Sequence, residues 1–313
     1  MRYLILLLVS LVIISGCFPT NTNAPDKNVI SEVNSQSGRL TNRGVTLKFI
    51  EGSPSQDRIR SEFPFSVRVL LENWASQPTS GDIYLSDKLS GSLSAIQGRV
   101  QQRFDLEGLD KGIRSTPKGK EIDLGSYTYP PSPSLTGTTI RAELEYDYNV
   151  KFFTDICVKS RDAKVNEQEC TSRRSFSNSD LGFDAQHAPV TVTNIKQELD
   201  SVGDATAEIF LTLTFEDFGG SDGWINNEEN SLDINGRIIL KGKGPFTCSP
   251  NLLKFRESRK KLEVDCFKQV SLDSSNFFSN PLEISLSYPY KSIVTTKEIP
   301  IKHRKEISTQ ILN

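Results

Sequence analysis

Hydrophobic and polar residues alternate with a period of two in four segments of the chain. These segments cover residues 63–71 and 140–148 in the first half and residues 207–215 and 282–290 in the second. Successive side chains of a strand point to opposite faces, so the alternation predicts strands with one face on a core and one toward solvent. Turn-forming glycine, proline, serine and asparagine separate the segments, and the best helical periodicity, over residues 93–109, fits a short helix or a long loop. The pattern predicts an all-β fold of antiparallel sandwiches.

The predicted strands recur at a fixed distance. Val69 and Leu211 lie 142 positions apart, and the same distance separates the Leu-x-Tyr-x-Tyr runs that begin at Leu144 and Leu286. We interpret this spacing as a tandem duplication of one β-domain, with chance recurrence among alternating strands as the alternative. A chain of 313 residues is long for one sandwich and sufficient for two. The predicted domains are residues 43–187 and 188–302, followed by a tail at 303–313.

The N-terminus has the pattern of a signal peptide. Arg2 precedes an apolar run over residues 4–14, interrupted only by Ser10, and the run ends at Ile14-Ser15-Gly16-Cys17. The apolar run is about half of the roughly 20 residues that a membrane-spanning helix needs, which makes a permanent anchor helix the less favoured interpretation. Composition after it is rich in asparagine, serine, threonine and proline without apolar periodicity, which predicts a flexible tether over residues 17–42.

The sequence Ile14-Ser15-Gly16-Cys17 resembles the lipobox of prokaryotic lipoproteins, in which the cysteine is lipidated and becomes the mature N-terminus. The resemblance implies a leader over residues 1–16, membrane lipid attached through Cys17, and an extracytoplasmic location on the cell surface or the periplasmic face. Ordinary signal cleavage beside an incidental cysteine is the alternative.

Four cysteines remain after Cys17, an even number in a chain that is expected to reach an oxidising compartment, which predicts two disulfides. Of the three possible pairings we favour Cys157 with Cys170 and Cys248 with Cys266, because each pair is close in sequence and falls in a different predicted domain. Loops of this length contribute about 3 kcal/mol each in the chain-entropy model. A zinc site is the alternative, but paired C-x-x-C spacing is missing.

Charge and composition argue against two classes of function, nucleic-acid binding and catalysis. The chain carries 37 basic and 39 acidic residues without one dominant basic block, which argues against a nucleic-acid partner. Its two histidines, His187 and His303, accompany no G-x-S-x-G motif, so we expect no enzyme and no cofactor, and keep a hydrolase with an unrecognised site as a remote alternative.

Several loops are candidates for binding. Aromatic residues at sandwich ends commonly contact partners or sugars, although packing in the core is the more usual role. The candidate aromatic residues are Trp74, Phe218 and Trp224. A weak calcium candidate consists of Asp222, Asn226 and Glu228, where a polar turn is favoured and no metal is assigned. Lys254, Arg256, Arg259, Lys260 and Lys261 form a basic run that we interpret as a charged hairpin tip, with contact to anionic headgroups as the alternative.

The segment Phe49-Ile50-Glu51-Gly52-Ser53-Pro54 contains a Phe-x-Glu-Gly-x-Pro pattern. With the strands that follow, it is similar to the tandem immunoglobulin-like domains of prokaryotic envelope proteins, particularly uncharacterised archaeal surface proteins, over residues 44–300. The resemblance implies two immunoglobulin-like sandwiches and no activity. We expect a lipid-anchored, non-enzymatic binding or structural module with a protein or glycan partner; an adhesion or glycan-binding component assisted by calcium is the alternative.

Overall fold

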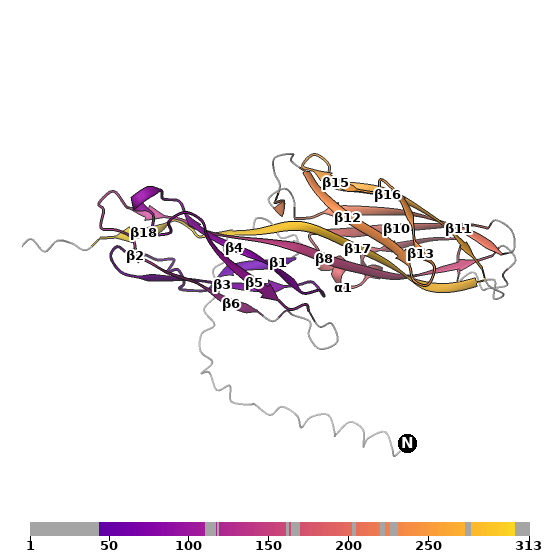
Figure 1. The fold of residues 1–313 in the computed structure, drawn as a ribbon, viewed down its shortest axis with the longest axis horizontal. Helices are drawn as coiled ribbons and strands as arrows, with labels where there is room; N and C mark the ends of the chain where they lie inside the picture. Colours follow the sequence, from indigo (N-terminus) through magenta and orange to yellow (C-terminus); the bar gives the residue numbers. More distant parts are fainter. Residues whose placement is uncertain are drawn as a thin grey trace, which may run out of the picture. The chain divides into compact units, whose positions relative to one another are not determined.

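Strands make up most of the described chain (Figure 1). The computed structural model describes residues 44–109, 117, 119–160, 163, 170–201, 205–219, 223–225, 231–272 and 277–303. The strands of the first half are β1 (Val45–Phe49), β2 (Ile59–Arg60), β3 (Phe65–Asn73), β4 (Thr79–Asp87), β5 (Val100–Leu106), β6 (Lys120–Tyr127), β7 (Gly137–Thr138) and β8 (Ile140–Lys159). β9 (Arg173–Ser177) lies between β8 and the end of the first half at residue 187. The strands of the second half are β10 (Val190–Ser201), β11 (Thr206–Asp217), β12 (Ser231–Leu240), β13 (Gly244–Pro245), β14 (Thr247–Ser249), β15 (Leu253–Arg256), β16 (Lys261–Ser271), β17 (Phe277–Thr295) and β18 (Ile299–Lys302).

Helical structure is limited to short turns between strands. They are the 3₁₀ turns η1 (Gly91–Leu93) and η2 (Asn178–Leu181) and the helix α1 (Phe183–His187). In the described part of the chain no helix is long and apolar enough to cross a bilayer. The all-β prediction is confirmed.

The main sheets form two layers of a β-sandwich. One layer is the sheet ordered β13-β12-β17-β8-β4-β5, with β15 also paired to β12. The other layer consists of the sheets β1-β3-β6 and β14-β16-β11-β10-β9. The layers meet across the two halves of the sequence, because β1 packs against β17 while β10 and β11 pack against β8. A small sheet, β2-β18-β7, includes the parallel pair β18–β2.

The strand order reflects the sequence repeat. The order β1-β3-β6 in the first half corresponds to β10-β11-β16 in the second, and β5-β4-β8 corresponds to β13-β12-β17. The repeated Leu-x-Tyr-x-Tyr runs pair with each other in antiparallel register, with Tyr146 opposite Tyr290 and Tyr148 opposite Tyr288. The two halves are therefore related by a local two-fold arrangement around the β8–β17 pair.

Both halves belong to one compact unit, residues 40–313. Strands β8 and β17 pair continuously from Arg141 opposite Thr295 to Lys159 opposite Phe277, so the predicted domains 43–187 and 188–302 share a sheet. The division into two domains at these bounds stays a prediction.

The predicted strands are confirmed and one local expectation is wrong. Residues 93–109 do not form a helix or a long loop throughout, because β5 pairs with β4 from Leu106 opposite Thr79 to Val100 opposite Leu85. Phe104 and Leu106 are buried while Arg103 and Asp105 are exposed. Buried and exposed side chains alternate with a period of two at the end of this segment, and β4 provides hydrogen-bond partners for its backbone. Both features favour a strand over a helix.

The predicted disulfide pairing is confirmed. Cys157 in β8 is bonded to Cys170, which precedes β9, and Cys248 in β14 is bonded to Cys266 in β16. Cys248 and Cys266 are directly opposite each other in the β14–β16 register. Two disulfides indicate an oxidising environment outside the cytosol.

Candidate binding surface

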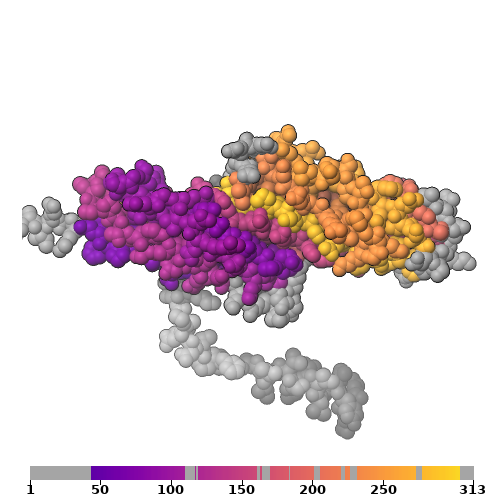
Figure 2. Space-filling view, viewed as in Figure 1, coloured from indigo at the N-terminus to yellow at the C-terminus, as the bar shows by residue number. Residues whose placement is uncertain are grey.

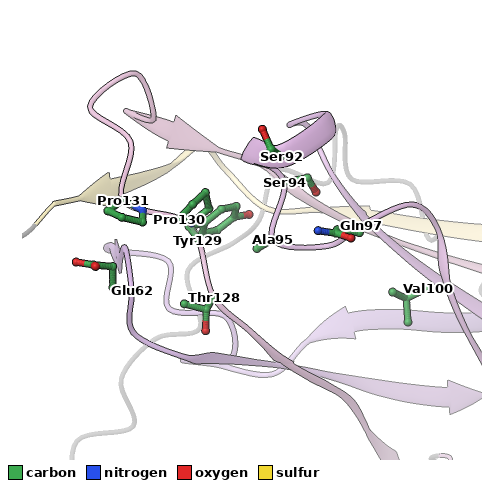
Figure 3. Close-up of a pocket in the computed structure, with 10 residues that line it drawn as sticks. All are labelled: Glu62, Ser92, Ser94, Ala95, Gln97, Val100, Thr128, Tyr129, Pro130 and Pro131. Carbon is green, nitrogen blue, oxygen red and sulfur yellow. The ribbon is translucent and has the colours of Figure 1, made fainter.

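A depression of about 540 Å³ lies in the first half of the fold, beside the proline-containing loop that follows β6 (Figure 3). Figure 3 shows Ser94 and Ala95 on one side of Tyr129 and Pro131 on the other, with Pro130 overlapping Tyr129 in this view. A second depression, of about 580 Å³, shares Ser92, Ser94 and Gln97 with the first. The first depression is lined by Glu62, Ser92, Ser94, Ala95, Gln97, Val100, Thr128, Tyr129, Pro130 and Pro131.

The carboxylate of Asp87, at the end of β4, fixes the loop between the two depressions. It accepts hydrogen bonds from Ser94 Oγ at 2.7 Å, from the backbone nitrogens of Ala95 at 3.2 Å and Ile96 at 3.5 Å, and from Tyr129 Oη at 2.9 Å. Three of these donors reach Oδ2 and one, Ser94 Oγ, reaches Oδ1. Asp87 therefore holds the loop and the Tyr129 phenol in fixed positions.

Tyr129 anchors the other wall. Its side chain is buried, its ring stacks on Phe65 at 5.3 Å between centroids, and burial raises the pKa of its phenol, with the neighbouring Asp87 carboxylate acting in the same direction. The phenol therefore stays neutral and donates to Asp87. Sequence reasoning did not identify Asp87, since an acidic residue at the end of a strand has no distinctive pattern.

This surface combines apolar and polar groups in a rigid frame. Pro130, Pro131, Ala95 and Val100 offer apolar contact, and the side chains of Ser92, Gln97, Thr128 and Glu62 offer hydrogen bonds. Proline restricts the backbone, and the Asp87 bonds fix the facing loop, so little conformational entropy is lost when a partner binds. Such an arrangement is suited to recognition of an extended polar segment by contact.

The predicted aromatic loops differ in exposure. Trp224 is fully buried and its indole nitrogen donates to Asp217 Oδ2 at 3.2 Å. Trp74 is also buried, and its ring stacks on His187 with centroids 5.5 Å apart. Phe218 retains 36% of its surface exposed. Both tryptophans thus contribute to packing, and of the three aromatic residues Phe218 is available for contact; binding through these loops stays a prediction.

The loops after β3 and β11 are equivalent in the repeat. Asn73 Oδ1 accepts from Ala75 N at 3.0 Å, and Asp217 Oδ1 accepts from Gly219 N at 3.1 Å. Each loop then bonds back to the start of its half, through Trp74 N to Gly44 O and Phe218 N to Pro189 O, both at 2.9 Å. The short side-chain turn after the strand explains why an asparagine and an aspartate occupy these positions.

Of the remaining candidate residues, His303 makes local contacts and the others lie outside the part of the chain that the structure describes. His303 lies with Nε2 2.6 Å from Leu135 O and Nδ1 3.1 Å from Ser61 Oγ, where it joins segments around the β2-β18-β7 sheet. Asp222, Asn226, Glu228 and Cys17 lie outside the described residues. Within the described ranges no cluster of histidine, cysteine, aspartate or glutamate could hold a metal ion.

Comparison with known proteins adds little. No family model matches the chain, and no match is found among curated proteins. Among solved structures, the chain is similar to the C-terminal globular domain of an oligosaccharyltransferase from Pyrococcus abyssi, at 6% identity and a TM-score of 0.23. The match covers 83% of this chain and 50% of that one, so the chain spans half the length of that structure. A similarity this weak indicates nothing about function.

Proposed function

We propose that the chain is an exported, lipid-anchored envelope protein that acts as a non-enzymatic binding or structural module. The observation that carries the proposal is the pair of disulfides within an all-β sandwich. Disulfides of this kind persist outside the cytosol, the leader over residues 1–16 supplies the export signal, and Cys17 supplies the site of attachment.

Contact rather than chemistry is supported by the geometry of the depression beside Tyr129. Its hydroxyl groups include Ser94, whose Oγ lies 2.7 Å from both Asp87 Oδ1 and Ile96 O and is thereby held in the loop. The hydrogen bonds from Tyr129 and two backbone nitrogens to Asp87 Oδ2 fix this carboxylate, and with it the wall of the depression, in one position that suits recognition by contact. The proposed partner is a protein or a glycan that lies across this surface.

The anchor is tested by metabolic labelling with an alkyne fatty acid in cells that express the chain. We expect the parent protein and a Ser15→Ala control, which keeps a small residue before the cysteine, to incorporate the label. Cys17→Ser should incorporate none and should be released or misprocessed, because the acyl-bearing thiol is gone. Acylation of Cys17→Ser, or recovery of the parent protein from the cytosol with its leader intact and its thiols reduced, would contradict the proposal.

Glycan recognition is separated from protein recognition by a glycan array probed with the mature protein in calcium and in chelator. Calcium-dependent binding would favour the adhesion alternative, in which residues 222–229 supply ligands. Binding that is equally strong in calcium and in chelator would favour the depression beside Tyr129 as the glycan site.

A further inference from the structure

The described chain begins at Gly44, and this residue lies where the two halves of the fold meet. Gly44 N donates to His187 O and Gly44 O accepts from Trp74 N, both at 2.9 Å. A Cβ atom added to Gly44 would come within 2.8 Å of the Pro189 ring, so the chain passes closely over the junction. Any segment that precedes Gly44 is therefore attached at the junction between the halves.

A cationic turn lies in the same region of the fold. We call residues 254–261 the basic hairpin; it connects β15 with β16 and is closed by backbone bonds between Arg256 and Arg259 at 2.8 and 3.3 Å. Arg256, Arg259, Lys260 and Lys261 are exposed. Figure 2 shows the orange part of the chain, which includes residues 254–261, at the surface of the molecule.

Few acidic groups in the described chain offset this charge. Lys254 lies 3.9 Å from Asp233, Lys261 is opposite Glu216 in the β11–β16 register, and Glu257 is the one acid within the basic hairpin. Arg259 and Lys260 form no ion pair with any residue that the structure describes. The tip of the basic hairpin therefore presents two cations without a fixed counter-charge among those residues.

Backbone contacts connect the basic hairpin to the junction. Asp217 N donates to Lys260 O at 2.9 Å, and the next residue, Phe218, donates from its backbone to Pro189 O at the same distance. Pro189 lies against Gly44. The basic hairpin, the exposed Phe218 and the point where the preceding segment enters the fold are thus joined through three successive contacts.

We propose that the basic hairpin docks on the anionic lipid headgroups of the membrane that holds the Cys17 anchor. This inference rests on the proposed lipid anchor. Residues 17–42, which the sequence predicts to be a flexible tether, would span roughly 30 Å on average as a coil. A tether of that length would keep the junction close to the bilayer and raise the effective concentration of the basic hairpin at its surface. A basic cluster adds attraction to anionic headgroups, and the partly exposed Phe218 ring is suited to the apolar boundary beneath them.

The competing explanation is that the charges only keep the β15–β16 tip from pairing with another sheet. Charges that serve this purpose act by repulsion and desolvation between proteins. They would produce no preference between neutral and anionic lipid, and so the two explanations differ in a measurable property.

The test uses the mature chain from residue 17 with Cys17→Ser, so that only the lipid is missing, in flotation with phosphatidylcholine vesicles with or without phosphatidylglycerol. We expect binding only when phosphatidylglycerol is present, and a decline as salt is raised. Arg259→Glu/Lys260→Glu should lower the partition coefficient at least about tenfold, given the contribution of each basic residue near an anionic surface. Lys297→Glu/Lys302→Glu, the same charge change at exposed positions of another region, is the matched control and should leave binding nearly unchanged.

Three results would overturn the inference: equal binding to both vesicle types, retained binding by Arg259→Glu/Lys260→Glu, or an equal loss in the control. Non-reducing gels and thermal unfolding establish that each variant is folded. This chain carries no lipid, so its binding to vesicles does not depend on acylation. A negative vesicle result would therefore leave the labelling result for Cys17 unaffected, and a negative labelling result would leave the vesicle result unaffected.

Discussion

At the scale of single residues, four tyrosines at the centre of the β8–β17 pair have different hydrogen-bonding states. Tyr288 Oη accepts from Val190 N at 3.0 Å, and Tyr146 Oη accepts from Val45 N at 3.3 Å, so each phenol caps the first strand of a half. Tyr148 Oη is buried and has no hydrogen-bond partner among the residues that the structure describes. Burial raises the pKa of Tyr146 to about 12 and those of Tyr148 and Tyr288 well above the usual value, so these phenols stay neutral.

These states predict different effects for the same substitution at two positions that face each other in the β8–β17 pair. Tyr288→Phe should lower the free energy of unfolding by about 1–3 kcal/mol, because it leaves Val190 N–H buried without an acceptor. Tyr148→Phe removes a buried hydroxyl that forms no hydrogen bond within the described part of the chain, and it should be neutral or slightly stabilising. Urea unfolding of both variants under non-reducing conditions measures the difference. Equal destabilisation by the two substitutions would show that the hydrogen-bonding difference has no energetic effect.

At the scale of elements, the turn after β11 is fitted around the Tyr290 ring of β17. A Cβ atom added to Gly219 or to Gly223 would overlap the Tyr290 ring or its hydroxyl. Gly236 in β12 differs, because the nearest atom to its added Cβ is Leu286 Cδ2 at 3.4 Å, an ordinary contact. Gly219 and Gly223 are therefore required because their backbone lies too close to the Tyr290 ring for a side chain, whereas β12 has room for a Cβ atom at Gly236.

Gly223→Ala should destabilise the protein by about 1–3 kcal/mol, since the overlap forces Tyr290 or the loop to move. Gly236→Ala should be tolerated or stabilising by up to about 1 kcal/mol, because alanine has less backbone freedom to lose in a strand. Thermal unfolding midpoints compare the two. If Gly236→Ala proves as harmful as Gly223→Ala, close packing on Tyr290 is not the reason for the glycine.

Strand positions and disulfides could be predicted from the sequence, whereas strand partners could not. Alternation located β3, β8, β11 and β17 because each has one buried face, and short separation paired Cys157 with Cys170. The pairing of β8 with β17 joins segments far apart in the chain, and no local pattern specifies it. The same limit applies to the depression beside Tyr129, where Asp87 and Tyr129 meet only after β4 and β6 are in place.

The sequence predicts that Trp74 and Trp224 lie in loops, but it does not predict whether their side chains are exposed or buried. Both residues follow strands among glycine, serine or proline, which is equally typical of a surface loop that binds and of a loop that folds inward. The inward orientation depends on partners supplied by the fold: His187 stacks on Trp74, and Asp217 accepts from Trp224. Phe218 has its backbone bonded to Pro189 and keeps its ring partly exposed.

At the scale of the whole molecule, the repeat does not produce two halves that pack only with themselves. Their central strands pair along their length, β1 of the first half packs on β17 of the second, and β10 packs on β8. Ser292 Oγ also donates to Val45 O at 2.8 Å across the halves. Removing either half would expose the buried face and the paired edge of the other, so we expect the halves to depend on each other for stability.

This interdependence predicts a single cooperative unfolding transition. Leu71 in β3 and Leu213 in β11 are fully buried and lie 142 positions apart, so Leu71→Ala and Leu213→Ala make the same cavity-forming change in equivalent strands. Each should cost about 2–5 kcal/mol and lower the midpoint of the same transition, measured by circular dichroism and by calorimetry. Two independent sandwiches would instead give two transitions, of which Leu71→Ala lowers one and Leu213→Ala the other. The shared β8–β17 pair favours the first outcome, because neither half can unfold without exposing the strand edge on which the other depends.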